Sequence, residues 1–291
     1  MIDLLESRRL FAAGVTITYN HGVMRIDGTS GADKIEFARL GKTQAAVYVD
    51  DVLTTAINLG KTVKSVTFSG GDGDDIFIMG RVPLPLTADG GDGNDAISAN
   101  AYQAFNDLLI GNRGNDYLYG GPGNDTLDGS GGDDGMNGGD GNDYIKVLSD
   151  NAGDDTVAGG NGYDIIDCTE YNRAVHLRIG DPRPPVLTVD DFVQRDVEDV
   201  LGTGFADNIA NVSGHPLTVH LGAGNDIYTG GTAAETIYGG AGSDRIATYG
   251  GNDVIIDTEG SNIVNGGDGT DTFKGKSTDE LTNIEVKDFV L

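Results

Sequence analysis

The sequence predicts an all-β protein, a parallel β-solenoid built from nine-residue repeats. The clearest segment is GNRGNDYLYGGPGNDTLDGSGGDDGMNGGDGNDYIK, residues 111–146. Cut every nine residues, its copies carry Gly at places 1 and 4, Asp at place 6 and an apolar residue at place 8. The apolar column consists of Leu118, Leu127, Met136 and Ile145. No long stretch of the chain has helical periodicity, so stacked short strands are the expected architecture.

The nine-residue register recurs along most of the chain. Further copies with this spacing are GTSGADKIE (28–36), GGDGDDIFI (70–78), GGDGNDAIS (90–98), DNAGDDTVA (150–158), GGNGYDIID (159–167), GTGFADNIA (202–210) and an unbroken series over 221–274. Places 1 to 6 predict a turn, because glycine permits positive φ. Places 7 to 9 predict a three-residue strand with place 8 pointing inward. Two repeats would then form one coil of eighteen residues, and successive coils would stack about 4.7–4.9 Å apart.

The stretches without clear repeats divide the chain into expected segments. Residues 37–69 carry alternating apolar positions and predict short antiparallel strands that edge the solenoid. We expect similar strands in the connector between the two arrays. The segments are an N-terminal β segment (1–69), a first repeat array (70–167), a connector (168–220), a second array (221–274) and a C-terminal cap or secretion signal (275–291).

Composition restricts the possible partners. Of 291 residues, 47 are glycine, and the formal net charge is −27. Such acidity argues against nucleic acid and anionic membranes and favours cations. No apolar run reaches the roughly 20 residues of a membrane span, and the first residues lack the pattern of a Sec signal peptide. The one cysteine, Cys168, cannot form an internal disulfide and reads as a small buried apolar group.

The aspartates at place 6 are the candidate metal ligands. Residues eighteen apart share one edge of a solenoid, which puts Asp107, Asp125 and Asp143 on one edge and Asp116 and Asp134 on the other. In the second array, Asp226, Asp244 and Asn262 share an edge, opposite Glu235, Asp253 and Asp271. Stacked carboxylates repel unless a cation lies between them. Carboxylate and carbonyl oxygens without nitrogen or sulfur ligands favour Ca²⁺ over Mg²⁺. The full candidate set is Asp75, Asp95, Asp107, Asp116, Asp125, Asp134, Asp143, Asp155, Asp164, Asp226, Asp244, Asp253 and Asp271.

The motif GGxGxDx-apolar-x resembles the nonapeptide of RTX, or hemolysin-type, calcium-binding proteins. That resemblance implies a parallel β-roll with several Ca²⁺ ions between turns, held by place-6 Asp and backbone carbonyls. Residues 167–210 are similar to the linkers between arrays of that family, including a V-E-x-V element that the final LTNIEVKDFVL echoes. The sequence departs from the motif at four turns, through Phe105, Phe205, Ala233 with Glu235, and the neutral Asn262. We expect weaker calcium sites there.

Three functions are compatible with the sequence. The leading one is a non-catalytic, secreted or cell-surface calcium-binding protein whose folding depends on calcium. The second is a calcium-dependent adhesin that binds extracellular polysaccharide or a cell surface, for which outward tyrosines (Tyr117, Tyr119, Tyr144) would be contacts. The third is a polysaccharide-modifying enzyme, although zinc-protease, serine-hydrolase and phosphate-loop motifs are absent from the sequence.

The last residues, Asp288-Phe289-Val290-Leu291, resemble the extreme C-terminal signal of RTX proteins exported by type I secretion. They equally fit a final strand that closes the solenoid.

Overall fold

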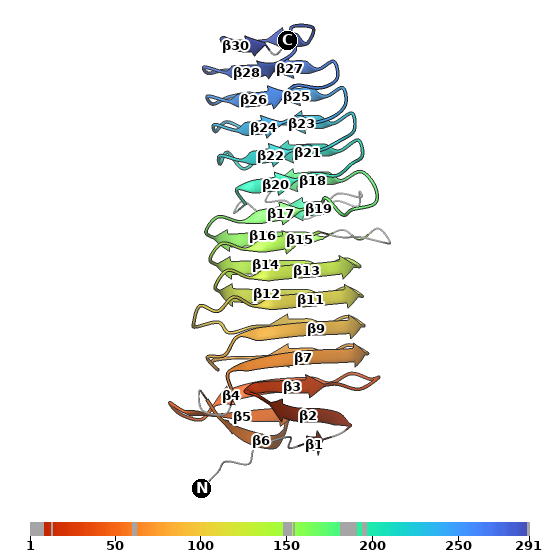
Figure 1. Cartoon of the computed structure of the whole chain (residues 1–291), viewed down its shortest axis with the longest axis vertical. Helices are drawn as coiled ribbons and strands as arrows, with labels where there is room; N and C mark the ends of the chain where they lie inside the picture. The colour runs from red at the N-terminus through yellow and green to blue at the C-terminus, as the bar shows by residue number, and fades with distance from the viewer. Residues whose placement is uncertain are drawn as a thin grey trace. The chain divides into compact units, whose positions relative to one another are not determined.

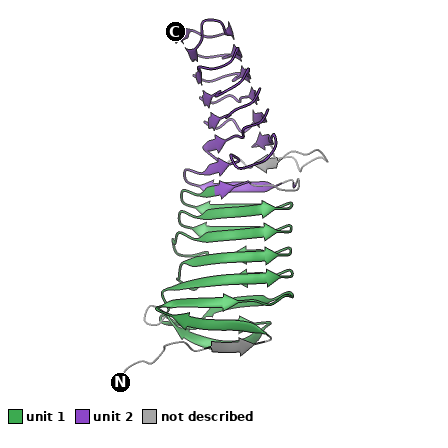
Figure 2. Ribbon diagram, turned by 45° about the vertical axis from the view of Figure 1, so that its right-hand side comes forward, with its two compact units in different colours: residues 1–144 green, residues 145–291 purple. Residues whose placement is uncertain are grey.

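The structure is a computed structural model that describes residues 9–12, 14–59, 63–147, 153, 155–180, 191–193 and 197–289. The chain divides into two compact units, residues 1–144 and 145–291 (Figure 2). The boundary falls within β15 (Tyr144–Lys146), between its first and second residues. The described residues form strands, turns and bends without a helix, so none of them forms a helix that could cross a membrane.

Unit 1 consists mainly of two parallel ladders whose strands alternate along the chain (Figure 1). The first ladder runs in the order β3 (Val23–Asp27), β7 (Ser65–Asp72), β9 (Leu86–Asp92), β11 (Leu108–Arg113) and β13 (Thr126–Gly131). The second runs in the order β4 (Lys34–Arg39), β8 (Ile76–Ile78), β10 (Ala96–Ser98), β12 (Tyr117–Pro122) and β14 (Gly135–Asp140). Each coil therefore contributes one strand to each ladder, as the repeat predicts.

Antiparallel strands edge unit 1 at its N-terminal end. On one ladder, β1 (Arg9–Ala12) pairs with β2 (Val15–Asn20), which pairs with β3. On the other, β5 (Gln44–Val49) lies between β4 and β6 (Val52–Asn58). This confirms the antiparallel prediction for most of residues 37–69. Its last part differs, because residues 65–69 belong to β7 and pair in parallel with β3.

Unit 2 repeats the arrangement with shorter strands. One ladder runs in the order β17 (Ile165–Asp167), β20 (Asp199–Leu201), β22 (Thr218–His220), β24 (Thr236–Tyr238), β26 (Val254–Asp257), β28 (Thr272–Gly275) and β30 (Val286–Phe289). The other runs in the order β16 (Thr156–Asn161), β19 (Asp191–Val193), β18 (His176–Ile179), β21 (Asn208–Asn211), β23 (Ile227–Thr229), β25 (Arg245–Ala247), β27 (Ile263–Asn265) and β29 (Glu280–Thr282).

The prediction of antiparallel strands in the connector is wrong for its described residues. Within 168–220, β18 pairs in parallel with both β19 and β21, and β20 pairs in parallel with β22. Leu177, Val200 and Val219 are buried on these strands, as a place-8 residue is in a repeat. The connector keeps the inward apolar residues of a coil although much of it lacks the nonapeptide motif, so it continues the stack instead of forming hairpins.

Place 8 forms the core of each unit. Leu109, Leu118 and Leu127 in unit 1, and Ile237 and Ile255 in unit 2, are fully buried. Register pairs such as Leu118↔Met136 and Ile237↔Ile255 place these side chains one coil apart in a continuous column. Burying a Leu or Ile side chain contributes about 1.5–3 kcal/mol, so the column is the main apolar contribution of every coil.

The turns stack so closely that glycine is required in them. Gly123 has φ +144°, and a Cβ built there would overlap the carbonyl group of Phe105 in the preceding coil. Gly242 has the same φ, and its Cβ would overlap the carbonyl group of Gly224. The conserved spacing of glycine within the repeats therefore reflects both backbone conformation and contact between coils.

Candidate metal centres

Place-6 residues gather on two edges of each unit. In unit 1 we call the turns that lead from the β7 ladder to the β8 ladder the first edge; it carries Asp75, Asp95, Asp116 and Asp134. The turns that lead back form the second edge, with Asp107, Asp125 and Asp143. All seven side chains are at most 3% exposed. The predicted sharing of edges by residues eighteen apart is confirmed in unit 1.

One oxygen of each place-6 aspartate ties two coils together. On the first edge, the backbone N–H of Asp95 donates to Asp116 Oδ1 at 2.8 Å, and that of Asp116 donates to Asp134 Oδ1 at 2.8 Å. On the second edge, the N–H of Asp107 donates to Asp125 Oδ1, also at 2.8 Å. Each carboxylate thus accepts a hydrogen bond from the coil before it, which fixes the side chain inside the turn.

The second oxygen is buried and accepts no hydrogen bond. This holds for Oδ2 of Asp75, Asp95, Asp107, Asp116 and Asp125 in unit 1, and for Oδ2 of Asp226 and Asp271 in unit 2. A buried carboxylate oxygen without a donor is energetically costly. A bound cation removes that cost, so these atoms fit the metal that the repeat predicts.

At several place-1 glycines, a carbonyl oxygen lies beside the carboxylate oxygen that has no hydrogen-bond donor. The site that a Cβ on Gly70 would fill is bordered by Asp75 Oδ2 and the carbonyl oxygen of Gly90. At Gly111, the corresponding atoms are Asp116 Oδ2 and the carbonyl oxygen of Gly129. A carboxylate oxygen from one coil therefore meets a carbonyl oxygen from the next. Both are hard donors of the kind that Ca²⁺ prefers.

Burial disfavours the ionised form of these carboxyl groups when no cation is bound. It is the largest cause that raises the pKa of Asp75, Asp116 and Asp125, each to about 7, and the pKa of Asp107 to about 6. Neighbouring aspartates on the same edge add to the effect; the charges of Asp134 and Asp95 both raise the pKa of Asp116. A cation between the coils would reverse both contributions.

Unit 2 has the same two edges. On its first edge, the N–H of Asp207 donates to Asp226 Oδ1 at 2.7 Å, and that of Asp226 donates to Asp244 Oδ1 at 2.8 Å. On its second edge, the N–H of Glu235 donates to Asp253 Oδ1 at 2.9 Å, and Asp253 donates likewise to Asp271. Asn262 follows Asp244 on the first edge, as predicted. The remaining candidates, Asp155 and Asp164, are buried as well.

Carboxylates at the ends of the ladders were not among the predicted site residues. The backbone N–H of Asp164 donates to Glu198 Oε2 at 2.9 Å, and that of Asp271 donates to Glu285 Oε2 at 2.8 Å. These glutamates belong to the two Val/Ile-Glu-x-Val-like elements, VEDV and IEVKD, so the repeated element was the available signal. Where the nonapeptide repeats end, each glutamate accepts the hydrogen bond that a place-6 aspartate accepts within the repeats.

Two place-6 aspartates differ from the others, because Oδ2 of each accepts a hydrogen bond from the N–H of a place-2 threonine. Asp207 accepts hydrogen bonds from the N–H and the hydroxyl of Thr203 and from the N–H of Val175. Asp33 Oδ2 accepts a hydrogen bond from the N–H of Thr29 at 2.6 Å. These turns carry Thr at place 2, and their carboxylates serve as hydrogen-bonded ends of the ladders.

A second, exposed ladder runs along place 5. The N–H of Asn115 donates to Asn94 Oδ1 at 2.8 Å, and the N–H of Asp133 donates to Asn115 Oδ1 at 3.0 Å. In unit 2, the N–H of Ser243 donates to Asn225 Oδ1 at 2.8 Å. The frequent Asn before the place-6 Asp was visible in the sequence and explains the recurring GND triplet.

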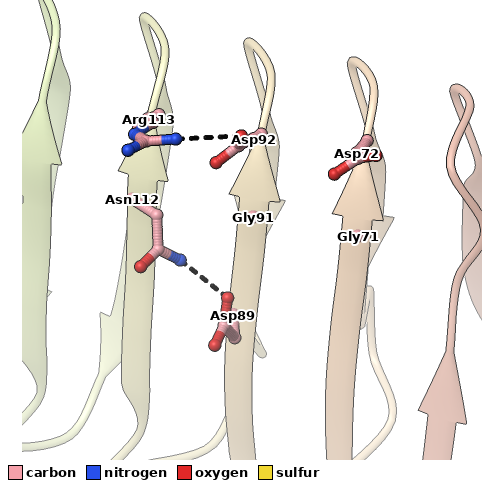
Figure 3. Close-up of a pocket in the computed structure, with 7 residues that line it drawn as sticks. All are labelled: Gly71, Asp72, Asp89, Gly91, Asp92, Asn112 and Arg113. Atoms are coloured by element: carbon pink, nitrogen blue, oxygen red, sulfur yellow. Dashed lines mark hydrogen bonds and ion pairs between the residues drawn. The ribbon is translucent and has the colours of Figure 1, made fainter.

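The candidate sites differ from the acidic pocket on the surface of unit 1. Figure 3 shows that pocket, where Asp72, Asp89 and Asp92 lie beside Gly71, Gly91, Asn112 and Arg113. Asn112 Nδ2 donates to Asp89 Oδ1 at 2.7 Å, and Arg113 pairs with Asp92 at 3.3 Å. These carboxylates are solvated or paired, unlike the buried oxygens on the edges. Of the three tyrosines proposed as outward contacts, Tyr117 is exposed, whereas Tyr119 and Tyr144 are half-buried.

Among the described residues, no three or more His, Cys, Asp or Glu side chains converge on a single point. Side chains alone would therefore supply only part of a coordination shell. The carbonyl oxygens beside the place-1 glycines are the additional donors that the turns offer. A site built largely from backbone oxygen suits Ca²⁺, which accepts six to eight oxygens in variable geometry.

Comparison with known families agrees with this geometry. The sequence model described as the RTX calcium-binding nonapeptide repeat (4 copies) matches residues 103–136, 110–145, 147–167, 220–255 and 248–277. No curated protein matches the chain. The matched stretches contain edge turns of both units, with the stacked carboxylates described above. The matched residues therefore carry RTX calcium-binding nonapeptide repeats, which stack in both units as coils of parallel strands.

Proposed function

We propose that this protein binds several Ca²⁺ ions between successive coils along the edges of both units, and that this binding drives its folding. The observation that carries the proposal is the row of buried carboxylate oxygens without hydrogen-bond donors, exemplified by Asp107, Asp116 and Asp226. The proposed ligands are Asp75, Asp95, Asp107, Asp116, Asp125, Asp134, Asp143, Asp155, Asp164, Asp226, Asp244, Asp253 and Asp271. Backbone carbonyl oxygens of the glycine turns would complete each site.

The physical argument concerns the folded state without cations. Folding without cations stacks carboxylates one strand spacing apart and removes them from water, within a chain of net charge −27. Both effects oppose folding. Bound divalent cations supply the opposite charge at those positions. Folding and calcium binding are then one coupled equilibrium, as in other domains whose metal sites form only on folding.

We further propose that the protein acts outside the cell, secreted or at the cell surface. Millimolar calcium suits sites of the affinity found in extracellular modules, about 10⁻⁴–10⁻³ M. The end of the chain, which resembles a type I secretion signal, would provide the export route. In the structure β30 reaches Phe289, which is 43% exposed, and Val290 and Leu291 lie outside the described residues.

The role we propose is structural and non-catalytic. The buried carboxylates are accounted for by the edge ladders, and the repeats of the two arrays occupy most of the chain. A solenoid of this kind supplies a calcium-dependent rigid scaffold, which fits a surface or secreted protein.

Direct measurement of bound calcium tests the proposal. The purified, calcium-depleted chain is dialysed to equilibrium against calcium between about 10 µM and 10 mM, and bound metal is counted per chain. The expected result is several ions per chain, with little binding of Mg²⁺ at equal concentration. A chain that binds no calcium in this range would refute the proposed function.

A further inference from the structure

The turn that contains Asn262 departs from the repeat in two positions at once. Its sequence, DTEGSNIVN, has Asp257 where place 1 is normally glycine and Asn262 where place 6 is normally aspartate. We propose that Asp257 replaces the missing place-6 carboxylate and forms, with Asp244, a calcium site between the turns 239–244 and 257–262. This inference rests on the proposed function, since it concerns one site within the same set.

The side-chain nitrogen of Asn262 cannot bind a cation, because an amide nitrogen is a hydrogen-bond donor. Its Oδ1 accepts a hydrogen bond from the N–H of Asp244 at 3.0 Å, which continues the ladder of the first edge. Its Nδ2 donates to the carbonyl oxygen of Glu259 at 2.8 Å, within its own turn. Where aspartate has a bare oxygen, Asn262 thus presents a donor that is already engaged.

Asp257 supplies a carboxylate in the same place. Asp257 is the last residue of β26, and the strand register pairs Ile256 with Tyr238 of the preceding coil. Asp257 and Gly239 directly follow these two residues, so they lie side by side in adjacent coils. The three atoms nearest to the position of a Cβ on Gly239 all belong to the Asp257 side chain, including Oδ2. In regular turns, such as Gly111 with Asp116, the oxygen at that position comes from the place-6 aspartate.

The Asp257 side chain has the properties of the other candidate ligands. It is 1% exposed, as is Asp244, and Oδ2 of each accepts no hydrogen bond. Asp257 Oδ1 accepts only a long hydrogen bond, 3.4 Å, from the N–H of Glu259 among the described residues. Burial raises the pKa of Asp257, and the negative charge of Asp244 raises it further. Two facing buried carboxylates require a cation or a proton between them.

Among the described residues, no lysine, arginine or histidine side chain forms an ion pair with Asp244 or Asp257. Lys276 contacts this turn through Nζ, which donates to the carbonyl oxygen of Gly260 at 3.3 Å. Asp279, one coil further, accepts hydrogen bonds from the N–H groups of Asn262 and Lys276. A divalent cation is therefore the group whose charge and oxygen preference match Asp244 and Asp257.

Substitutions at this turn separate the possibilities. Asp257→Asn removes one negative charge with little change in volume, and Glu259→Gln is the matched control, because Glu259 is an exposed carboxylate of the same turn. The double variant Asp257→Gly with Asn262→Asp restores the regular repeat. Bound calcium is counted by equilibrium dialysis at about 1 mM calcium, and circular dichroism verifies that each variant is folded.

We expect Asp257→Asn to bind one calcium ion fewer than the wild type, Glu259→Gln to bind the wild-type number, and the double variant to regain the lost ion. An Asp257→Asn variant that is folded and retains the full number of ions would overturn the inference, and would indicate that Asp257 holds a proton instead. If Asp257→Asn does not fold, the double variant decides alone: a count one above the wild type overturns the inference, because it shows that the wild-type turn holds no ion. A wild-type chain without calcium would refute the proposed function instead.

Discussion

The backbone N–H of Asp107 donates to Oδ1 of Asp125, eighteen residues later, at 2.8 Å. The N–H of Asp125 donates in turn to Oδ1 of Asp143. Each of these aspartates therefore holds the preceding coil with one carboxylate oxygen. In Asp107 and Asp125 the other oxygen, Oδ2, accepts no hydrogen bond in the protein interior. This division of the carboxylate explains why one residue type recurs at one place, and it makes both the fold and its dependence on cations testable.

Removal of calcium should unfold the chain. With about ten sites of Kd near 10⁻⁴ M, about 1 mM calcium stabilises the folded state by roughly 14 kcal/mol, which is as large as the whole stability of a typical domain. We expect the far-ultraviolet circular dichroism of a β protein in calcium and that of an unfolded chain in EGTA, with recovery when calcium is added. A β-spectrum that chelation leaves unchanged would contradict the coupling.

Protons should partly replace calcium. The fold raises the pKa of Asp116 and Asp125 to about 7, above the value of about 3.9 in an unfolded chain. Between these values the folded state binds more protons than the unfolded state, so the stability of the calcium-free chain falls as pH rises from about 4 to about 7. In calcium-depleted buffer we expect more β-structure at pH 5 than at pH 8.

Calcium binding should show the opposite dependence on pH, because the ions require ionised carboxylates. The apparent Kd should increase as pH falls below about 7, and calorimetric titrations at pH 8 and pH 6 measure the change. The preceding prediction has its own test: equal β-structure content of the calcium-free chain at pH 5 and pH 8 would show that these carboxyl groups do not control its folding.

Substitution of a glycine between coils should cost more than substitution of a glycine in an open turn. Gly242 has φ +144°, and its Cβ would overlap the carbonyl group of Gly224, whereas Gly41 has no atom within 4 Å of its Cβ position. The strained conformation alone costs about 1–3 kcal/mol, and the overlap adds to it. Thermal melting in calcium should show a lower Tm for Gly242→Ala and little change for Gly41→Ala. Similar melting of the two variants would mean that the turns stack less closely.

The sites on the two edges of unit 2 should be unequal. Asp244 lies within its ladder, and its Oδ2 is bare. Oε2 of Glu235 also lacks a donor, but its Oε1 accepts hydrogen bonds from the N–H of Gly231 and from Asn211 Nδ2, and its turn carries Ala at place 4. We expect Asp244→Ala to lose more bound calcium than Glu235→Ala in calorimetric titration. Equal losses would show that the departures from the motif do not weaken the site.

The sequence determined the repeat unit and the sharing of edges. A spacing of nine residues with an inward place 8 requires Leu118 and Met136 to stack one coil apart, and it puts Asp107 and Asp125 on one edge. These relationships follow from periodicity alone, because consecutive regular repeats form coils of equal length and each coil contacts only its neighbours. The resemblance of the motif to the RTX nonapeptide predicted calcium as the bound cation.

Only the tertiary structure decided features that depend on how one coil lies against another. The first part of the connector lacks the nonapeptide, yet its strands pair in parallel, because Leu177 and Val200 fill the core as a place-8 residue does. Asp257 occupies a place-1 position that is glycine in most repeats, and its side chain is buried against Gly239 of the preceding coil. A local sequence pattern predicts the face on which a side chain lies. Which oxygen of a carboxylate has no hydrogen-bond donor depends on the backbone of the adjacent coil.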